Sequence, residues 1–326
     1  MKRKKSAVLY CGMLLFLVEL LLTSGSGFAH AQAAGKQPQL VWVDTDIGDD
    51  IDDAFALGLI LKTPEMKVLG VSTAFGDTEM RARLTSRFLS ATGNGNIPVT
   101  AGVHTNTSNV LSQASYAEHW PKVIHGDGVA AMLAAIRKNP GQVTLIAIGP
   151  LFNIGAAIDL DAATFRKVKR VVIMGGAVRR GYGAPDAKPV PEWNILQDPK
   201  GAAKLFASGV PLFVMPLDST QIQLPESERD KLFAAGTPLT DQITLLYHQW
   251  FILGGNRNPT PTLFDPVAVA YAIDPALCPM QPMRIEVDPN GLTREVEGKP
   301  NAQVCLKSDE NAFFQLLLGR LRGEGK

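Results

Sequence analysis

Six aspartates lie within ten residues of one another near the start of the chain, at positions 44, 46, 49, 50, 52 and 53. Asp44 and Asp46 end an apolar run, and side chains two apart in a strand share a face, so both point the same way. Such a group of carboxylates repels itself unless protons, helix dipoles or a bound cation offset the charge. Oxygen ligands with no Cys or His nearby favour a hard cation, Ca²⁺ or Mg²⁺. Helix capping and a solvated acidic loop explain one or two of the six acids but not all of them.

The elements around this cluster alternate between two hydrophobic patterns. They predict strands at residues 39–46, 67–74, 98–102, 143–149, 169–175 and 211–217, and helices at 52–61, 79–92, 128–137, 151–158 and 199–208. This alternation predicts an α/β fold with a mostly parallel central sheet and helices on both faces. The acids then follow the first strand, at the edge where open parallel sheets bind ligands.

The C-terminal part of the chain follows a different pattern. Short strands at residues 284–287, 292–296 and 302–306 predict a small β-meander, and a final helix covers 309–322. Residues 102–128 and 175–193 are long irregular stretches, and loops of that length in a compact domain are often functional.

The first 31 residues have the pattern of a signal peptide. Four basic residues at positions 2–5 precede an apolar run at 7–22, and Ala29-His30-Ala31 matches the small-x-small cleavage pattern. We therefore predict an exported, periplasmic or secreted bacterial protein whose mature domain is residues 32–326. The alternative is an uncleaved membrane anchor, although the run is near the lower length limit for a spanning helix and contains Glu19. No stable membrane anchor is expected after cleavage.

Composition and charge exclude several classes of protein. A hydrophobic content of 46% is too high for a disordered chain. The formal net charge of +1 becomes −2 when four basic residues and one acidic residue leave with the signal peptide, and neither value is typical of nucleic-acid binding. Three cysteines are too few for a disulfide scaffold. Cys278 and Cys305, which remain after export, either form one disulfide or stay as two buried thiols, and the sequence favours neither.

In its motifs the chain resembles the inosine–uridine-preferring nucleoside hydrolase family. The family's opening signature is an apolar strand followed by Asp-x-Asp-x-Gly and then Asp-Asp-Ala, and further segments that begin at residues 71, 125, 143, 172, 192, 217 and 264 match in the expected order. The resemblance implies an open Rossmann-like nucleoside hydrolase fold. It also implies a Ca²⁺-dependent enzyme that hydrolyses the N-glycosidic bond of ribonucleosides to free base and ribose. The match is specific for the family and much less specific for the substrate.

The resemblance further implies roles for individual residues. Asp46 would be the general base for the attacking water and a Ca²⁺ ligand. Asp53, the backbone carbonyl of Ile148 and Asp265 would be the other Ca²⁺ ligands. The residues implied to bind the substrate are Asp52, Asp77, His125, Met174, Glu192, Asn194 and Phe264. A homodimer and a homotetramer are both compatible with the sequence, which does not fix the oligomeric state.

Several positions depart from the family pattern. The signature contains two additional residues, Asp49 and Asp50, compared with the shortest family form. Asp50 could therefore take the role assigned to Asp46. Asp77 stands where many relatives have Asn, and the segment between residues 174 and 192 is longer than in compact members. Phe264 replaces a His that the family links to protonation of the leaving base; an aromatic residue there could stack on the base, and residues 247–250 could supply an acid or a stacking wall.

Three alternatives to a ribonucleoside hydrolase stay open. The missing His and the altered loops would suit a non-catalytic protein that binds a nucleoside or ribose on the same scaffold. The extended loop at residues 175–191 would suit a hydrolase of another N-ribosylated compound. A phosphatase, suggested by Asp-x-Asp after an apolar strand, is the weakest alternative.

Overall fold

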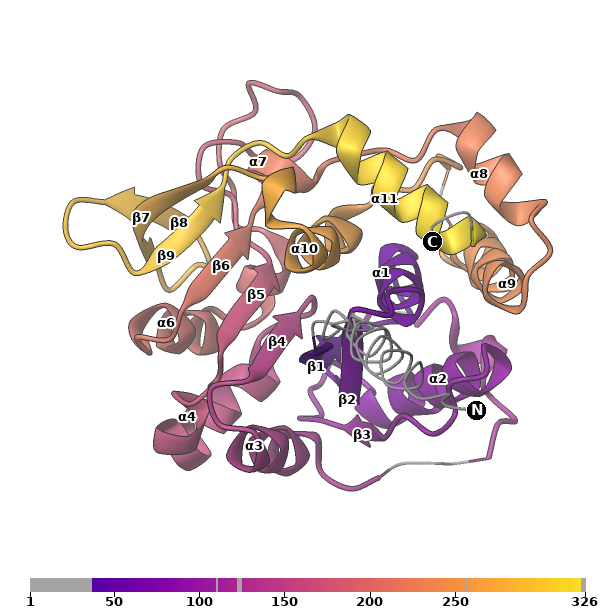
Figure 1. Ribbon diagram of the computed structural model, residues 1–326. Coiled ribbons are helices and arrows are strands. Elements are labelled where there is room, and N and C mark those ends of the chain that lie inside the picture. Colours follow the sequence, from indigo (N-terminus) through magenta and orange to yellow (C-terminus); the bar gives the residue numbers. More distant parts are fainter. Residues whose placement is uncertain (1–36, 110, 122–124, 256, 324–326) are drawn as a thin grey trace, which may run out of the picture. The chain divides into compact units, whose positions relative to one another are not determined.

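Nine strands form one sheet in the order β3-β2-β1-β4-β5-β6-β9-β7-β8 (Figure 1). The computed structural model describes residues 37–109, 111–121, 125–255 and 257–323, so the predicted signal peptide lies outside the described residues. The strands are β1 (Gln39–Thr45), β2 (Met66–Thr73), β3 (Val99–Ala101), β4 (Val143–Ala147), β5 (Arg170–Met174), β6 (Leu212–Met215), β7 (Met280–Val287), β8 (Thr293–Val296) and β9 (Ala302–Cys305). All pairs from β3 to β9 are parallel, whereas β7 is antiparallel to both β9 and β8. The predicted mostly parallel α/β sheet is confirmed.

Helices cover both faces of this sheet (Figure 1). The α-helices are α1 (Asp52–Leu61), α2 (Thr78–Ala91), α3 (Gly128–Lys138), α4 (Phe152–Phe165), α5 (Trp193–Gln197), α6 (Pro199–Ala207), α7 (Leu217–Thr220), α8 (Glu226–Phe233), α9 (Pro238–Leu253), α10 (Phe264–Ile273) and α11 (Glu310–Arg322). Side chains of a strand alternate between two cores, since Val41 and Val43 pack with α1, α9, α10 and α11, whereas Trp42 packs with α3, α4 and α6. No helix within the described residues is long and apolar enough to cross a membrane.

The strand order reverses between β1 and β4, which places the acidic segment at the point where open α/β sheets bind ligands. β1 pairs with β2 on one side and β4 on the other, so the loops after these strands leave in different directions. The Ile148 N–H donates to the Asp44 carbonyl at 2.8 Å, which holds the end of β4 beside the end of β1. The backbone therefore brings residues 46 and 148 together although about a hundred residues separate them.

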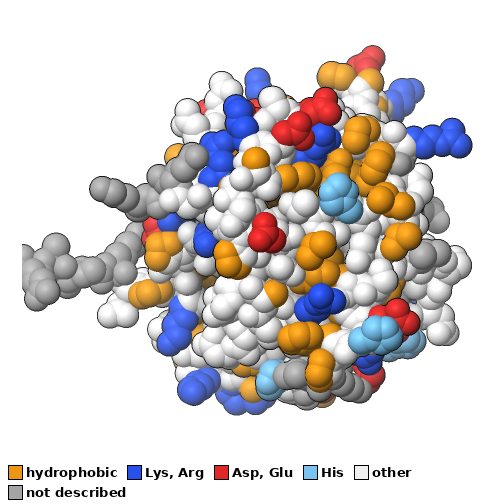
Figure 2. Space-filling view, turned by 90° about the vertical axis from the view of Figure 1, so that its right-hand side faces the viewer, with side chains coloured by type: hydrophobic (Ala, Val, Ile, Leu, Met, Phe, Trp, Pro, Cys, Tyr) orange, Lys and Arg blue, Asp and Glu red, His pale blue; other side chains and the backbone are white. Residues whose placement is uncertain are grey.

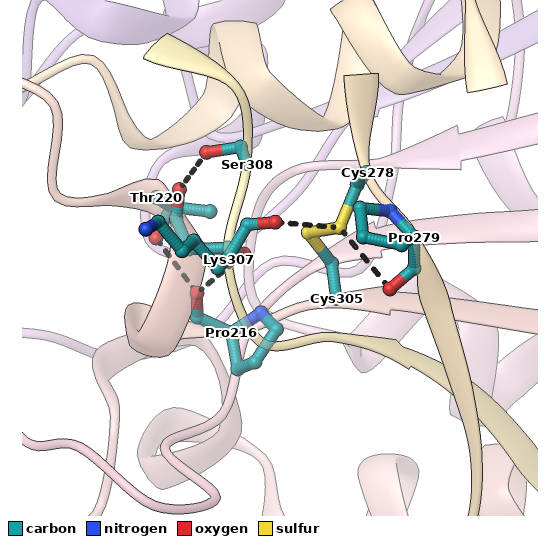
Figure 3. The surroundings of a disulfide bond; sticks show 8 residues. Pro216, Thr220, Cys278, Pro279, Cys305, Lys307 and Ser308 are labelled. Atoms are coloured by element: carbon teal, nitrogen blue, oxygen red, sulfur yellow. Dashed lines mark hydrogen bonds between the residues drawn. A yellow bond between two sulfur atoms is a disulfide. The ribbon is translucent and has the colours of Figure 1, made fainter. Parts of the chain in front are cut away.

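The C-terminal strands extend the main sheet. β7 lies between β8 and β9, and β9 continues the parallel part beside β6, so the strands are not in the sequential order of a simple meander. A disulfide joins Cys278, which follows the short 3₁₀ helix η2 (Pro275–Leu277), to Cys305 at the end of β9, with 5.8 Å between their Cα atoms (Figure 3). The structure thus has the disulfide, one of the two states that the sequence left open.

Candidate active site

A cavity of about 350 Å³ opens beside the carboxyl ends of β1, β4 and β5. Its lining residues are Asp46, Asp49, Asp50, Asp52, Asp53, Asn109, Ser112, Ile148, Met174, Tyr182, Glu192, Trp193, Asn194, Trp250, Gly254, Phe264 and Asp265. Seven of these are acids, and none of the described residues that line the cavity is Lys, Arg or His. A cavity of this charge suits a cation or an uncharged polyhydroxy ligand and repels an anion.

Close backbone packing places Asp46 in the cavity. A Cβ on Gly149 would lie 2.8 Å from both the backbone N and Oδ1 of Asp46, so only glycine fits at the end of β4. Asp44 does not line the cavity: the strand ends at Thr45, and the Asp44 carboxylate turns into the protein, where Asn153 Nδ2 donates to it at 2.7 Å. The two acids that the strand period places on one face thus have different surroundings.

Three buried carboxylates form a cluster that could hold a metal ion. One oxygen each from Asp52, Asp53 and Asp265 lies within 4.8 Å of the others. Asp52 and Asp53 occupy the first turn of α1, and Asp265 occupies the first turn of α10, so two helix N-termini direct their positive ends toward the acids. The cluster includes Asp52, which the family pattern assigns to the sugar, while Asp46 lines the same cavity beside it.

Hydrogen bonds fix the orientation of the cluster. The backbone N–H of Asp265 donates to Asp52 Oδ2 at 3.0 Å, which joins the starts of α1 and α10. Thr45 Oγ1 donates to Asp53 Oδ1, and Ile47 N donates to the same hydroxyl at 3.1 Å. Among the described residues no side chain donates to the Asp46 carboxylate, which has a hydrogen bond only from its own backbone N–H, so it can still bind a ligand or a water.

Burial and mutual repulsion raise the pKa values of these acids. Burial is the largest cause for Asp46, whose pKa rises to about 7, while the charge on Arg81 opposes the rise. The pKa values of Asp52, Asp53 and Asp265 are raised well above the usual range, first by burial and then by neighbouring carboxylates. The ionised cluster needs a compensating positive charge, and its all-oxygen donors fit a hard divalent cation.

A second group of polar atoms borders the cluster at the ends of β4 and β5. Asn194 Nδ2 donates to the carbonyls of Ile148 and Met174, at 3.2 and 3.1 Å. The Glu192 carboxylate caps α5 and accepts from Asn194 N, Ile195 N and Gly176 N. Burial raises the pKa of Glu192 to about 7. The structure therefore brings Ile148, Met174, Glu192 and Asn194 to one side of the cavity.

Aromatic side chains line the remaining part of the cavity. Tyr182 and Phe264 meet edge to face, with ring centroids 6.3 Å apart. Trp193 N donates to Tyr182 Oη at 3.0 Å, and the Trp250 side chain hydrogen-bonds the Asp50 carboxylate. Burial, followed by the charge on Glu192, raises the pKa of Tyr182, so this phenol stays protonated near neutral pH. This end of the cavity can stack on a flat ring and donate one hydroxyl hydrogen bond.

Two of the residues expected at the substrate do not line this cavity. Asp77 is exposed and caps α2, where its carboxylate accepts from Met80 N at 3.0 Å, and it lines a separate smaller pocket. His125 is exposed, and its Nδ1 lies 3.1 Å from the backbone N of Val99. An N-cap role explains an acid just before a helix, which is the pattern that Asp77 has.

The family of the chain follows from comparison with known proteins. Residues 41–315 match the family model described as inosine-uridine preferring nucleoside hydrolase. The chain is 26% identical to probable uridine nucleosidase 2 of Arabidopsis thaliana, over 89% of this chain and 99% of that protein. It is 30% identical to the pyrimidine-specific ribonucleoside hydrolase RihA of Shewanella sp. (strain ANA-3), over 86% and 95% of the two chains. The solved plant nucleoside hydrolase PpNRh1 has the same fold, with a TM-score of 0.77, 24% identity and coverage of 87% and 99%.

The chain belongs to the inosine–uridine-preferring nucleoside hydrolase family, as its motifs indicate. It is an N-glycosyl hydrolase of the ribonucleoside hydrolase class. The buried carboxylate cluster agrees with a metal-dependent enzyme of this family.

Proposed function

We propose that the protein hydrolyses the N-glycosidic bond of ribonucleosides with the help of a Ca²⁺ ion and an aspartate base. The observation that carries this proposal is the buried cluster of Asp52, Asp53 and Asp265 in a cavity whose described lining residues supply no positive side chain. Several carboxylates and a backbone carbonyl would suit Ca²⁺, which accepts six to eight oxygen ligands in flexible geometry, better than Mg²⁺, which demands a near-ideal octahedron.

In this proposal two members of that cluster, Asp53 and Asp265, hold the cation together with Asp46 and the carbonyl of Ile148, while the third member, Asp52, contacts the sugar. A bound cation of this kind lowers the pKa of a coordinated water and orients it. Asp46 removes the proton of the attacking water, because its carboxylate lies in the cavity beside the proposed cation and no described side chain donates a hydrogen bond to it.

The sugar is assigned to the neighbouring acids and amide. Asp52, Glu192 and Asn194 accept from or donate to the ribose hydroxyls, and Met174 packs against the ring. The carboxylates around the ribose also stabilise the positive charge that develops on the sugar as the glycosidic bond breaks. Ionised carboxylates around the sugar repel an anionic substrate. They are therefore compatible with a nucleoside, which is uncharged.

The base is assigned to the aromatic end of the cavity. Phe264 cannot donate a proton, and the described lining residues include no His. Stacking on Phe264 and a hydrogen bond from the Tyr182 hydroxyl are therefore the interactions proposed to help the base leave. Because the two relatives above are named for uridine and pyrimidine nucleosides, uridine is the first substrate to test.

Membership of the hydrolase family argues against the alternative of a protein that only binds a nucleoside. Incubation of the mature protein with uridine, with free ribose measured over time, tests the proposal directly. Ribose release supports uridine as a substrate, whereas thermal stabilisation by uridine without any release of ribose contradicts it.

We also propose that the protein is exported and that its signal peptide is removed after residue 31. The disulfide between Cys278 and Cys305 supports this, because disulfides persist in oxidising compartments. Mass spectrometry of the protein purified from the periplasm or medium tests it: a chain that begins at residue 32 is expected, and an intact N-terminus in the cytoplasm contradicts it.

A homodimer or homotetramer is the assembly we propose. Leu245, Ile252 and Leu253 of α9 are exposed, and Figure 2 shows hydrophobic side chains exposed among charged ones on one face of the molecule. Exposed apolar side chains of this number favour self-association. Light scattering of the mature protein gives the mass directly, and a monomer at micromolar concentration contradicts the proposal.

A further inference from the structure

The acidic segment that follows β1 has an unusual pattern of backbone hydrogen bonds. Each of the five carbonyls from residue 46 to residue 50 accepts a hydrogen bond from outside the segment. The donors belong to three buried residues, Arg81 of α2 and the pair Ser112 and Gln113 in the long loop before α3. These hydrogen bonds hold the backbone of the segment in one conformation. In that conformation its carbonyls point away from the cavity and its acids can face it.

Arg81 holds the first half of the segment. Its side chain is 1% exposed, and its guanidinium donates to the carbonyls of Asp46 and Ile47 and, at 2.6 Å, to the Asp49 carboxylate. Nε donates to the carbonyl of Phe75 at 2.8 Å. Phe75 has a φ of 65°, the one positive value among the described non-glycine residues, and Arg81 thus also holds a strained turn after β2.

Gln113 and Ser112 hold the second half. Gln113 N donates to the Gly48 carbonyl at 3.0 Å, and its Nε2 donates to the carbonyls of residues 49 and 50, at 3.3 and 2.8 Å. Ser112 Oγ donates to the carbonyl of residue 49 at 3.0 Å. Gly48 has a φ of +127°, and a Cβ there would lie 2.7 Å from Leu111 of the same loop, so the two loops are closely packed.

We propose that Arg81 and Gln113 are positioning residues that clamp the segment 46–50 and thereby fix the Asp46 carboxylate in the cavity. This inference rests on the proposed function and adds residues that touch neither substrate nor cation. The planar guanidinium reaches four acceptors at once, which a lysine ammonium cannot do. Loss of the guanidinium hydrogen bonds lets the Asp46 backbone move. A displacement of about 1 Å at a catalytic group can lower the rate about 100-fold.

The test compares Arg81→Lys and Gln113→Met with the matched controls Arg83→Lys, on the same helix, and Gln142→Met, on the surface. Circular dichroism establishes that each variant is folded, and Gln113→Met keeps the test decisive if Arg81→Lys does not fold. Calorimetric titration with CaCl₂ measures the cation affinity independently of turnover. Uridine hydrolysis at saturating Ca²⁺ separates kcat from KM.

We expect Arg81→Lys to lower kcat about 100-fold and Gln113→Met to lower it about tenfold, with KM changed much less and the Ca²⁺ affinity weakened about tenfold. Guanidinium ion added to Arg81→Ala is expected to restore part of kcat, since the pocket beside Arg81 opens to solvent. Folded Arg81 and Gln113 variants with the kcat and Ca²⁺ affinity of the controls would overturn the clamp while leaving the hydrolase standing. A wild-type protein that neither binds Ca²⁺ nor releases ribose would instead overturn the proposed function, and the clamp's catalytic role with it.

Discussion

Each acid in the cavity is distinguished by the group that contacts it. Asp49 pairs with Arg81 at 2.6 Å, Asp50 with the side chain of Trp250, and Asp52 with the backbone N–H of Asp265. Asp46 has no such side-chain partner among the described residues. This difference favours the proposal that Asp46 is the base, because an indole N–H already donates to the Asp50 carboxylate.

The substitution Asp46→Asn tests this assignment. It keeps the size of the side chain but removes the basic oxygen, and the loss of a general base is expected to lower kcat by about 1,000-fold. Ribose release from uridine measures the effect, with Asp159→Asn, a surface residue paired with Lys204, as the control. Activity of Asp46→Asn within a few-fold of the control would assign the base elsewhere.

At the base end, Tyr182→Phe tests the phenol. The raised pKa of Tyr182 keeps its proton on the oxygen, so the residue acts as a hydrogen-bond donor to the base. Its loss is expected to lower kcat/KM about tenfold, the effect of about 1.4 kcal/mol. Tyr271→Phe, outside the cavity, is the control, and equal kcat/KM values for both variants would show that the Tyr182 hydroxyl does not help the base to leave.

At the scale of the elements, the disulfide ties η2 and the start of β7 to the end of β9 (Figure 3). It closes a loop with a sequence separation of 27, for which the chain-entropy relation gives about 3.5 kcal/mol. The double variant Cys278→Ser/Cys305→Ser is expected to have a free energy of unfolding lower by that amount. Its urea midpoint should therefore fall. It should keep its activity, because neither cysteine lines the cavity. An unchanged urea midpoint would show that the bond adds no stability.

Hydrophobic periodicity predicted most of the elements that carry the site. The predicted helix 52–61 agrees with α1 at both ends, and the strand order then places the acids at the sheet edge. α10 was not predicted, because its residues are apolar nearly all round and have no helical period. Asp265 at its first turn was found from the family motif alone.

The contacts of Arg81 and Gln113 with residues 46–50, and the aromatic lining of the cavity, could not be predicted from sequence. Arg81 reads as one of several basic residues on an amphipathic helix, and Gln113 as a polar residue in a loop; only long-range packing reveals that both are buried. Tyr182 lies in the extended loop whose length favours a functional role, but loop length does not say which side chain faces the cavity. For Asp77 the local sequence was the better guide. An acid just before a helix is typical of an N-cap, and its carboxylate caps α2, whereas the family motif implies that it binds the substrate.

At the scale of the whole molecule, the buried acids link stability to metal and pH. The folded-state pKa values are raised, to about 6 for Asp44 and about 7 for Asp46 and Glu192, so their stabilising effect is present at low pH and lost as pH rises through these values. With EDTA, the melting temperature is expected to fall as the pH rises from about 4, near the usual pKa of these acids, to about 7.

Addition of Ca²⁺ should reverse this loss. At about a hundred times its Kd, the ion should add about 2.7 kcal/mol, with the largest effect at the higher pH, where the acids are ionised. Scanning calorimetry measures the melting temperature in EDTA and in CaCl₂ at each pH, with NaCl of equal ionic strength as the control. A melting temperature that is independent of Ca²⁺ at all pH values would contradict a cation site in this cavity.

The function that we propose for this chain is the release of ribose from ribonucleosides with a bound Ca²⁺ ion. The direct measurement is a reducing-sugar assay of the mature protein with uridine, cytidine, inosine and adenosine, each in CaCl₂ and in EDTA. We expect ribose release from at least one nucleoside in CaCl₂, its loss in EDTA and its return when Ca²⁺ is restored. Release that continues unchanged in EDTA, or no release from any nucleoside in CaCl₂, would contradict it.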